Sequence, residues 1–329
     1  MSLKGISGGS AFGETRPTSD LAVPASVANL GGGFDTLAVA VQLYLRVRVV
    51  DVRADGQARL TVVRSTPEVR GRNAVERAFE TIVRRTGVNA PSVSVEVESE
   101  IPMAAGLGSS AAATVAGLRV FEHVTDAELS GRTLLGVASS LEGHADNAAA
   151  ALYGGLTSVV ERDGEDPVAL RWHWPGDLRL VVVTPSAGLS TSRARAALPE
   201  AVPRRDAVFN LQRVLSLVHA LQHGEYDRLR EATRDRLHQP ARTALIPQLT
   251  TVLALEDPEI LAAFLAGAGP SMALVARRDF ARLERLLASI YEGAGSAATV
   301  RTLDVHQTVG ARETLARLER SREAVGKPV

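Results

Sequence analysis

Apolar and polar residues alternate most regularly over residues 92–101, where polar side chains separate Val93, Val95 and Val97. A period of two predicts a half-buried β-strand. Other β-rich runs are shorter or less regular, and they predict strands at residues 21–23, 39–52, 59–64, 156–161, 178–184, 271–276 and 299–305. Residues 26–35, which contain three consecutive glycines, and residues 102–108 are expected to form loops.

Helical segments are interleaved with these strands in irregular order. The predicted helices span residues 74–86, 109–123, 130–142, 191–198, 207–223, 226–237 and 279–291. An alanine-rich stretch at 146–152 ends at Gly154. This mixture of elements predicts an α+β fold rather than a doubly wound parallel sheet.

The length of 329 residues is too great for one ordinary core and suits two lobes. Helices become longer after residue 190, and we place the boundary between the lobes near residues 175–177. The expected domains are therefore residues 21–175 and residues 176–329. Residues 1–20 are rich in Gly, Ser and Thr, and we expect a disordered leader there.

Composition excludes several classes of protein and site. The 37 basic and 37 acidic residues balance, so there is no electrostatic reason to expect nucleic acid or a membrane surface as partner. The chain has no cysteine, which excludes disulfides, thiolate–zinc sites and cysteine nucleophiles. No apolar run reaches the roughly 18 residues that would suggest a membrane-spanning helix. We therefore expect a soluble cytoplasmic protein.

The segment I-P-M-A-A-G-L-G-S-S-A-A-A, which begins at Ile101, joins the end of a predicted strand to the start of a predicted helix. Amide groups at a helix N-terminus lack intrahelical partners and carry the positive end of the dipole. Gly106 and Gly108 permit positive φ, and Ser109 and Ser110 are able to cap the helix or reach a phosphate or metal. The segment therefore predicts an anion site that suits a polyphosphate.

Three other interpretations of this segment are possible. It lacks the Gly-Lys-Ser/Thr ending of a Walker loop. It matches a dinucleotide fingerprint only in part, because Ala111 takes the final glycine position and no suitably placed acidic residue follows. The simplest alternative, a capped helix start with glycines for close packing, stays open on local physics.

Residues 102–112 resemble the phosphate-binding loop of the GHMP kinases, and further motifs are similar to those of the homoserine kinase family. In the expected order these are V-P-A-S-V-A-N-L-G-G-G-F-D-T-L from Val23, E-G-H-A-D-N from Glu142, G-G-L from Gly154, L-S-T-S-R-A-R-A-A-L-P from Leu189, D-A-V-F-N-L from Asp206, R-L-H-Q-P from Arg236 and G-A-G-P-S from Gly267. The resemblance implies a two-lobed GHMP kinase fold. Its N-terminal lobe is like ribosomal protein S5 domain 2, its C-terminal lobe is ferredoxin-like, and a homodimer is possible.

The resemblance also implies the reaction, which converts ATP and L-homoserine to ADP and O-phospho-L-homoserine in threonine biosynthesis. The nucleotide-binding residues would be Pro102, Gly106, Leu107, Gly108, Ser109 and Ser110. Ser110 and Glu142 correspond to the family's Mg²⁺ ligands, a hydroxyl and a carboxylate that suit this ion. Without the resemblance, Glu142 would be read as a solvated carboxylate at a helix end. Ser110, Glu142 and Asn147 are the implied catalytic residues.

A zwitterionic amino acid needs an anion for its ammonium group and cations for its carboxylate. By the resemblance Asp35 binds the ammonium group, and Arg195 and Arg242 bind the carboxylate, which a guanidinium contacts at two points. The implied substrate-binding residues are Asn29, Asp35, His144, Asp146, Asn147, Thr191, Arg195, Arg242 and Gly269, with Asn147 nearest the acceptor hydroxyl. His144 is either a substrate contact or structural. Arg193 is expected at the surface, since Thr191 and Arg195 share a helix face.

Some GHMP kinases pair an Asp base with a Lys, but this chain has no lysine between Lys4 and Lys327. The homoserine kinase pattern requires no dedicated base, so positioning and charge neutralisation would carry catalysis. Gly32, Ala145 and Ala150 stand where the family commonly has proline, which is expected to relax the substrate pocket. Two alternatives stay open: a GHMP kinase for another small alcohol, and a non-catalytic binding protein of this fold.

Overall fold

The computed structural model describes residues 20–69 and 71–307. Apart from Asp20, the predicted leader lies outside the described residues, as does the end of the chain after residue 307. The two-lobed α+β prediction is confirmed, because the described strands form two separate sheets with helices packed on each. None of the described helices combines the length and apolar character needed to cross a bilayer.

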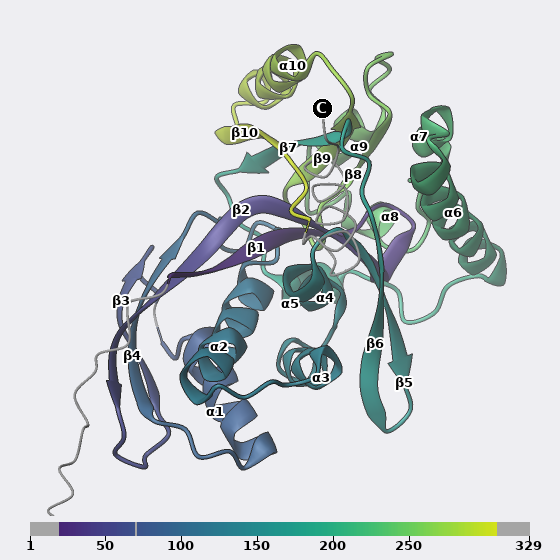
Figure 1. Ribbon diagram of the computed structural model, residues 1–329. Helices are drawn as coiled ribbons and strands as arrows, with labels where there is room; N and C mark the ends of the chain where they lie inside the picture. Colours follow the sequence, from purple (N-terminus) through teal and green to yellow (C-terminus); the bar gives the residue numbers. More distant parts are fainter. Residues whose placement is uncertain (1–19, 70, 308–329) are drawn as a thin grey trace, which may run out of the picture.

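The larger sheet has the strand order β3-β4-β2-β5-β6, with β1 paired to β2. Its strands are β1 (Asp20–Asn29), β2 (Gly33–Arg53), β3 (Leu60–Thr66), β4 (Ser92–Ser99), β5 (Leu156–Arg162) and β6 (Glu165–Trp172). The pairs are antiparallel except β3 with β4, which run parallel. In Figure 1 the helices α1, α2 and α3 lie below β1 and β2, while the smaller sheet lies above them.

Four helices cover the lower face of this sheet: α1 (Ala74–Thr86), α2 (Ser109–Thr125), α3 (Gly131–Glu142) and α4 (Asp146–Tyr153). The predicted bounds of α1 are confirmed, because Asn73 caps its first turn and Gly87 ends it at φ 65°. A Cβ at Gly117 of α2 would overlap the carbonyl of Val75 in α1. This close packing fixes α2, and therefore the glycine-rich loop that precedes it, against the lobe.

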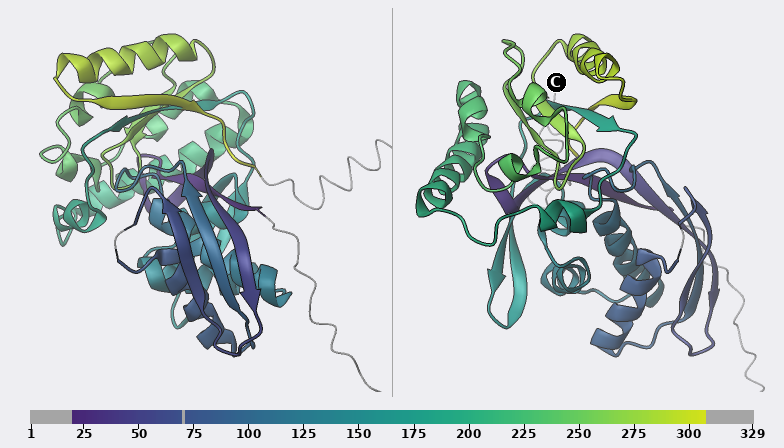
Figure 2. Two further views of the ribbon diagram at one scale, coloured as in Figure 1. Left: turned by 90° about the vertical axis from the view of Figure 1, so that its left-hand side faces the viewer. Right: turned by 180° about the vertical axis from the view of Figure 1, so that it is seen from behind.

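The smaller sheet has the order β10-β7-β9-β8, and all its pairs are antiparallel. Its strands are β7 (Arg179–Pro185), β8 (Ala262–Leu265), β9 (Met272–Ala276) and β10 (Ala298–Leu303). Between β7 and β8 the chain forms α5 (Thr191–Ala196), α6 (Arg204–His223), the 3₁₀ turn η1 (Tyr226–Arg228), α7 (Leu229–Ala232), α8 (Gln239–Arg242) and α9 (Leu249–Leu253). Helix α10 (Phe280–Gly293) joins β9 to β10 and lies along β10 in Figure 2. This βαββαβ order is that of a ferredoxin-like lobe.

Strand β7 is buried on both faces. Leu180 and Val182 belong to the core shared with the larger sheet, whereas Val181 and Val183 pack with Leu283 and its neighbours on α10. A continuous apolar run is typical of a strand covered on both sides. The smaller sheet is therefore wedged between the larger sheet and its own helices.

The chain after β10 returns to the larger sheet. His306 exchanges backbone hydrogen bonds with two of its segments, donating to the carbonyl of Ala40 at 2.9 Å and accepting from Gly155 at 2.8 Å. Gln42 also donates its backbone N–H to the carbonyl of Asp304 at 2.9 Å. Residues 304–307 thus belong spatially to the N-terminal lobe, although the boundary proposed from the sequence near residues 175–177 assigns them to the other.

Several elements differ from the sequence predictions, and α8, α9 and β8 were not predicted at all. Residues 26–29 extend β1 instead of beginning a loop, and Leu30–Gly32 alone form the turn into β2. The helix predicted at 226–237 ends at Ala232, because the Asp235 carboxylate accepts hydrogen bonds from the backbone of the next residues and competes with the helix. Strand β6 was not predicted, although Asp163-Gly164 before it is a hairpin turn sequence.

Candidate active site

A pocket between the lobes brings together every predicted site residue except Gly269. Those that line it are Asn29, Asp35, Pro102, Gly106, Leu107, Gly108, Ser109, Ser110, Glu142, His144, Asp146, Asn147, Thr191, Arg195 and Arg242. Gly267 and Ala268 line it in place of Gly269. Gly269 instead packs against the glycine-rich loop. A Cβ added to Gly106 would lie within 3 Å of the Gly269 backbone.

The glycine-rich loop is held from both lobes. Leu107 accepts a backbone hydrogen bond from Ser26 at 3.1 Å, and Ala104 accepts one from Leu189 at 2.9 Å. Gly106 and Gly108 have φ of 81° and 70°, and a Cβ at Gly108 would overlap the Ser26 hydroxyl. The glycines therefore do serve close packing, as the simplest alternative expected.

The same loop also presents the start of α2 to the pocket. Gly108 occupies the N-cap position and has no side chain with which to cap the first turn. The following residues, Ser109 and Ser110, line the pocket at the positive end of the helix dipole. The alternative of a capped helix start is therefore wrong about the cap, because no side chain caps this helix. The free amides at its start suit a bound phosphate.

Glu142 lies at the end of α3 and faces α2. Its Oε1 accepts hydrogen bonds from the Ser110 hydroxyl at 3.0 Å and from the Thr114 hydroxyl at 2.6 Å. A carboxylate beside a hydroxyl suits Mg²⁺, which binds few protein ligands and completes its shell with water and phosphate oxygens. Within residues 20–69 and 71–307 no cluster of three His, Cys, Asp or Glu could hold a metal ion by itself. The residues present therefore fit a metal that arrives with a nucleotide.

The start of α4 forms a second polar group. Oδ1 of the buried Asp146 accepts a hydrogen bond from the backbone N–H of Asn147 at 2.7 Å and lies 2.8 Å from Nδ1 of His144. The hydrogen bond to Asp146 raises the pKa of His144, against the opposing effect of burial. The Oδ1 atom of Asn147 accepts from the Ser26 hydroxyl at 2.9 Å, which fixes the orientation of the side-chain amide. Asn147 is thereby held between the glycine-rich loop and β1.

Asp35 and Arg195 form an ion pair across the pocket. Arg195 Nη1 lies 2.9 Å from Oδ2, and Nη2 lies 2.7 Å from Oδ1. Asp35 has φ of 51°, and its amide donates to Asn29 Oδ1 at 3.1 Å, which holds this unusual backbone conformation. Arg195 is half-buried and Arg193 exposed, in agreement with the helix-face argument. Asp35 and Arg195 thus neutralise each other.

Arg242 is only 1% exposed, and no carboxylate among the described residues is its hydrogen-bond partner. In the described part of the chain its guanidinium donates to the carbonyls of Ala194 and Gly267, at 3.3 and 3.1 Å, and lies 3.0 Å from His238 Nδ1. Burial, together with the positive charge of Arg195, lowers the pKa of Arg242 to about 10, so the group remains cationic at neutral pH. It is a buried positive charge at the wall of the pocket.

Several contributors were not found from the sequence. Thr114 lies one helical turn after Ser110, so the i, i+4 spacing could have pointed to it. Phe34 lines the pocket, with Arg195 and Arg242 each 5.7 Å from its ring centroid. Ser26 is 121 residues from its partner Asn147, and no local pattern connects them.

Comparisons with known proteins identify the family of this chain. Residues 73–155 match the family model of the GHMP kinases N terminal domain. The homoserine kinase of Solibacter usitatus is 36% identical over 283 residues, which cover 84% of this chain and 91% of that protein. The homoserine kinase of Deinococcus radiodurans is 40% identical over 250 residues, or 76% of this chain and 81% of that protein.

Solved structures agree as well. The crystal structure of homoserine kinase from Cytophaga hutchinsonii superposes with a TM-score of 0.79 at 26% sequence identity, covering 91% of this chain and 98% of that one. The fold is therefore shared over most of the length. The chain belongs to the homoserine kinase family of the GHMP kinases.

Proposed function

We propose that this protein transfers the γ-phosphate of ATP to the side-chain hydroxyl of L-homoserine, giving ADP and O-phospho-L-homoserine. The observation that carries the proposal is the buried Arg242, whose hydrogen-bond partners in the described residues are uncharged, next to the Asp35–Arg195 ion pair. Together these groups offer two positive charges and one negative charge on one side of the glycine-rich loop.

This charge pattern complements a free amino acid. A buried cation is costly unless an anion compensates it, and the carboxylate of an amino acid supplies that anion to Arg242. Asp35 is then the partner for the substrate ammonium group, and Arg195 is able to share the carboxylate. Asp35 and Asp235 offset the charge of Arg242 only from a distance, and a neutral sugar adds no anion that could hydrogen-bond to it, which favours homoserine over the uncharged acceptors of other GHMP kinases.

The nucleotide is proposed to bind with its phosphates against the first turn of α2. Ser110 and Glu142 would hold Mg²⁺, which supplies charge neutralisation to the transferring phosphoryl group. Thr114 donates to the same Glu142 oxygen and fixes the carboxylate toward α2. The loop glycines let the backbone approach the phosphates without a side chain in between.

In the transfer, the homoserine hydroxyl oxygen forms a bond to the γ-phosphorus while the bond from that phosphorus to the β–γ bridging oxygen breaks. The hydroxyl proton passes to solvent water, and ADP departs with the electron pair of the broken bond. Asn147, held by Ser26, is proposed to orient the hydroxyl. No side chain is assigned as a base, since positioning and charge neutralisation carry most of such a reaction.

A coupled assay of ADP formation tests the proposal, with ATP, Mg²⁺ and a panel of L-homoserine, L-threonine, L-serine, mevalonate and galactose. We expect turnover with homoserine, loss of turnover with EDTA, and a ³¹P signal of O-phosphohomoserine. Preference for another acceptor would mean a different GHMP kinase. Absence of turnover across the panel, with ATP still bound, would mean a binding protein.

The cytoplasmic location and the homodimer that the resemblance implies stay predictions. Size-exclusion chromatography with light scattering measures the second directly. A mass of one chain at working concentration would contradict it.

A further inference from the structure

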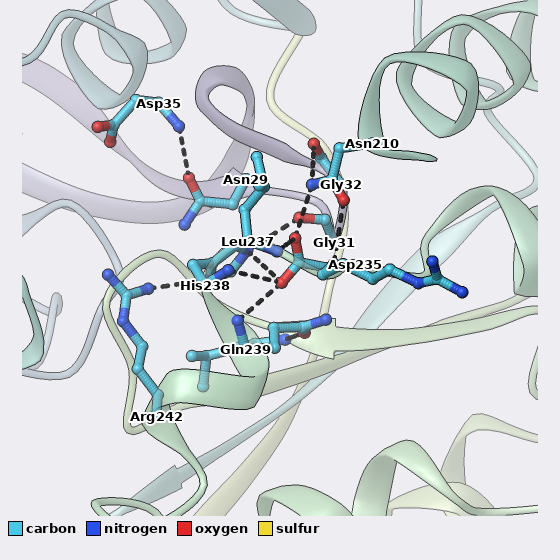
Figure 3. Close-up of polar contacts among 12 residues, drawn as sticks. Asn29, Gly31, Gly32, Asp35, Asn210, Asp235, Leu237, His238, Gln239 and Arg242 are labelled. Carbon is cyan, nitrogen blue, oxygen red and sulfur yellow. Dashed lines mark hydrogen bonds and ion pairs between the residues drawn. The ribbon is translucent and has the colours of Figure 1, made fainter. Parts of the chain in front are cut away.

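The motif R-L-H-Q-P places a cluster of buried polar groups behind the pocket (Figure 3). Its centre is Asp235, whose side chain is 0% exposed. Oδ2 accepts from the amides of His238 at 3.0 Å and Gln239 at 2.7 Å, while Oδ1 accepts from the amide of Leu237 at 2.9 Å. Nδ2 of Asn210 also donates to Oδ1, at 2.7 Å. Asp235 therefore fixes the backbone that carries His238 and starts α8.

The hydrogen bonds of His238 define its tautomer. Nε2 lies 2.9 Å from the carbonyl oxygen of Gly31, and Nδ1 lies 3.0 Å from Nη1 of Arg242. A carbonyl only accepts and a guanidinium only donates, so Nε2 carries the hydrogen and Nδ1 presents a lone pair. Burial lowers the pKa of His238, as does the charge of Arg242, against the opposing effect of Asp235 at 3.6 Å. The imidazole is thus a neutral acceptor for Arg242.

Because His238 is a neutral acceptor, it holds the Arg242 guanidinium without reducing its positive charge. Nε and Nη1 of Arg242 are engaged by Ala194, Gly267 and His238, while Nη2 forms no hydrogen bond within the described residues. A carboxylate in the place of His238 would fix the guanidinium equally well but would cancel the charge that attracts the substrate. The imidazole fixes the group and leaves its charge intact.

The same histidine also touches the strand that carries Asp35. Its ring stacks on Phe34, with centroids 5.2 Å apart and planes at 23°, and its Nε2–H holds the Gly31 carbonyl in the β1–β2 turn. Asn210 holds the neighbouring Gly32 carbonyl at 2.9 Å. The turn where Gly32 replaces the family's usual proline is therefore anchored from the C-terminal lobe.

We propose that His238 is a positioning residue that orients Arg242 toward the carboxylate of the amino-acid substrate through its Nδ1 lone pair, without neutralising the guanidinium. His238 itself does not line the pocket. The proposal rests on the proposed function, since it requires a substrate carboxylate at Arg242.

Two substitutions separate this role from a purely structural one. In His238→Asn the side-chain oxygen can occupy the position of Nδ1, so an acceptor for Arg242 is kept and the donor to Gly31 is lost. In His238→Gln the side-chain NH₂ can occupy the position of Nε2, so the donor to Gly31 is kept and the acceptor is lost. Each variant thus removes one of the two hydrogen bonds.

We expect His238→Gln to raise the KM for homoserine by about 10- to 100-fold, the range for one hydrogen bond to a charged group, and His238→Asn to raise it by less than about threefold. The KM for ATP should change by less than about twofold in both. The opposite order, or equal effects of the two variants, would overturn the proposal and leave His238 as an anchor of the β1–β2 turn. An inactive wild-type enzyme would instead overturn the proposed function.

A measurement on the unaltered protein remains decisive if a variant does not fold. Long-range ¹H–¹⁵N spectra of the seven histidines should show the His238 ring in the Nε2–H form, with a pKa below the ordinary value of 6.5. A hydrogen on Nδ1 of the His238 ring, or a pKa of that ring raised above 6.5, would contradict the assignment of His238 as acceptor.

Discussion

Arg195 meets Asp35 at two points, Nη1 to Oδ2 at 2.9 Å and Nη2 to Oδ1 at 2.7 Å, although these two residues are assigned to opposite ends of the substrate. The pair is part-exposed, with 37% and 36% of the side chains accessible. Solvent screens such a pair, so its own contribution to stability is small, about 0–1 kcal/mol. We propose that the pair exchanges partners when a zwitterion enters: the ammonium group takes the place of Arg195 beside Asp35, and the carboxylate takes the place of Asp35 beside Arg195.

Arg195→Ala should therefore impair substrate binding much more than folding. We expect the KM for homoserine to rise by at least about 30-fold, from loss of a charged hydrogen bond, with the midpoint of urea unfolding nearly unchanged. Arg85→Ala is the matched control, because it breaks a comparable ion pair with Asp166 far from the pocket. Equal kinetics for the two variants would remove Arg195 from substrate recognition.

Asn147→Ala is expected to act on turnover. Loss of a group that orients the reacting hydroxyl should lower kcat by about 10²-fold while the Kd for ATP changes by less than about threefold. Ser26→Ala removes only the hydrogen bond that holds Asn147 and should give a smaller fall in kcat. Steady-state kinetics and calorimetric titration with a non-hydrolysable ATP analogue measure both quantities. A turnover unchanged by Asn147→Ala would exclude this residue from the mechanism.

The His144–Asp146 contact predicts a pH-dependent contribution to stability. Asp146 raises the pKa of folded His144 above its ordinary value of 6.5, so the contact stabilises the protein fully below pH 6.5 and loses its effect as pH rises through the raised pKa. The difference in unfolding free energy between wild type and His144→Asn should accordingly be larger at pH 6 than at pH 9.

His306 offers a control of opposite sign. Burial lowers the pKa of His306, so its neutral form is favoured in the folded state and the protein loses stability as pH falls. His306→Asn should therefore become more favourable relative to wild type at low pH. The same pH trend for both variants would show that neither histidine is the source of the effect.

Gly108→Ala tests the packing of the glycine-rich loop. A Cβ there combines an unfavourable φ of 70° with overlap of the Ser26 hydroxyl. Gly87→Ala is the matched control, since Gly87 has φ of 65° but nothing within 4 Å of its Cβ position. The control should lose about 1–2 kcal/mol of stability and keep its activity, whereas Gly108→Ala should lose more and bind ATP more weakly. Chemical unfolding and ATP titration provide the comparison.

The sequence was most informative where structure is local. The bounds of α1 follow from its amphipathic period and its two caps, Asn73 and Gly87, and the glycine-rich loop is recognisable because strand, turn and helix are adjacent. Strand β6 could not be predicted in this way, because it is an edge strand with Pro167 and three charged residues and shows little alternation of apolar and polar positions.

Relationships between distant segments could not be predicted. His238 and Gly31 are 207 residues apart, and Asp35 and Arg195 are 160 apart. The resemblance implies that Asp35 and Arg195 bind the substrate, but nothing in the sequence indicates that they pair with each other. The burial of Arg242 likewise depends on how α8 docks against the turn between β1 and β2, which periodicity does not reveal.

Because alternate residues of β7 serve two different cores, neither half of the molecule can lose its partner without exposing apolar surface in the other. Residues 304–307, which follow β10, also form backbone hydrogen bonds to the larger sheet and so connect the two lobes a second time. The halves should therefore melt together in one cooperative transition, and severing the chain near residue 176 should yield two fragments that survive only as a reassembled pair.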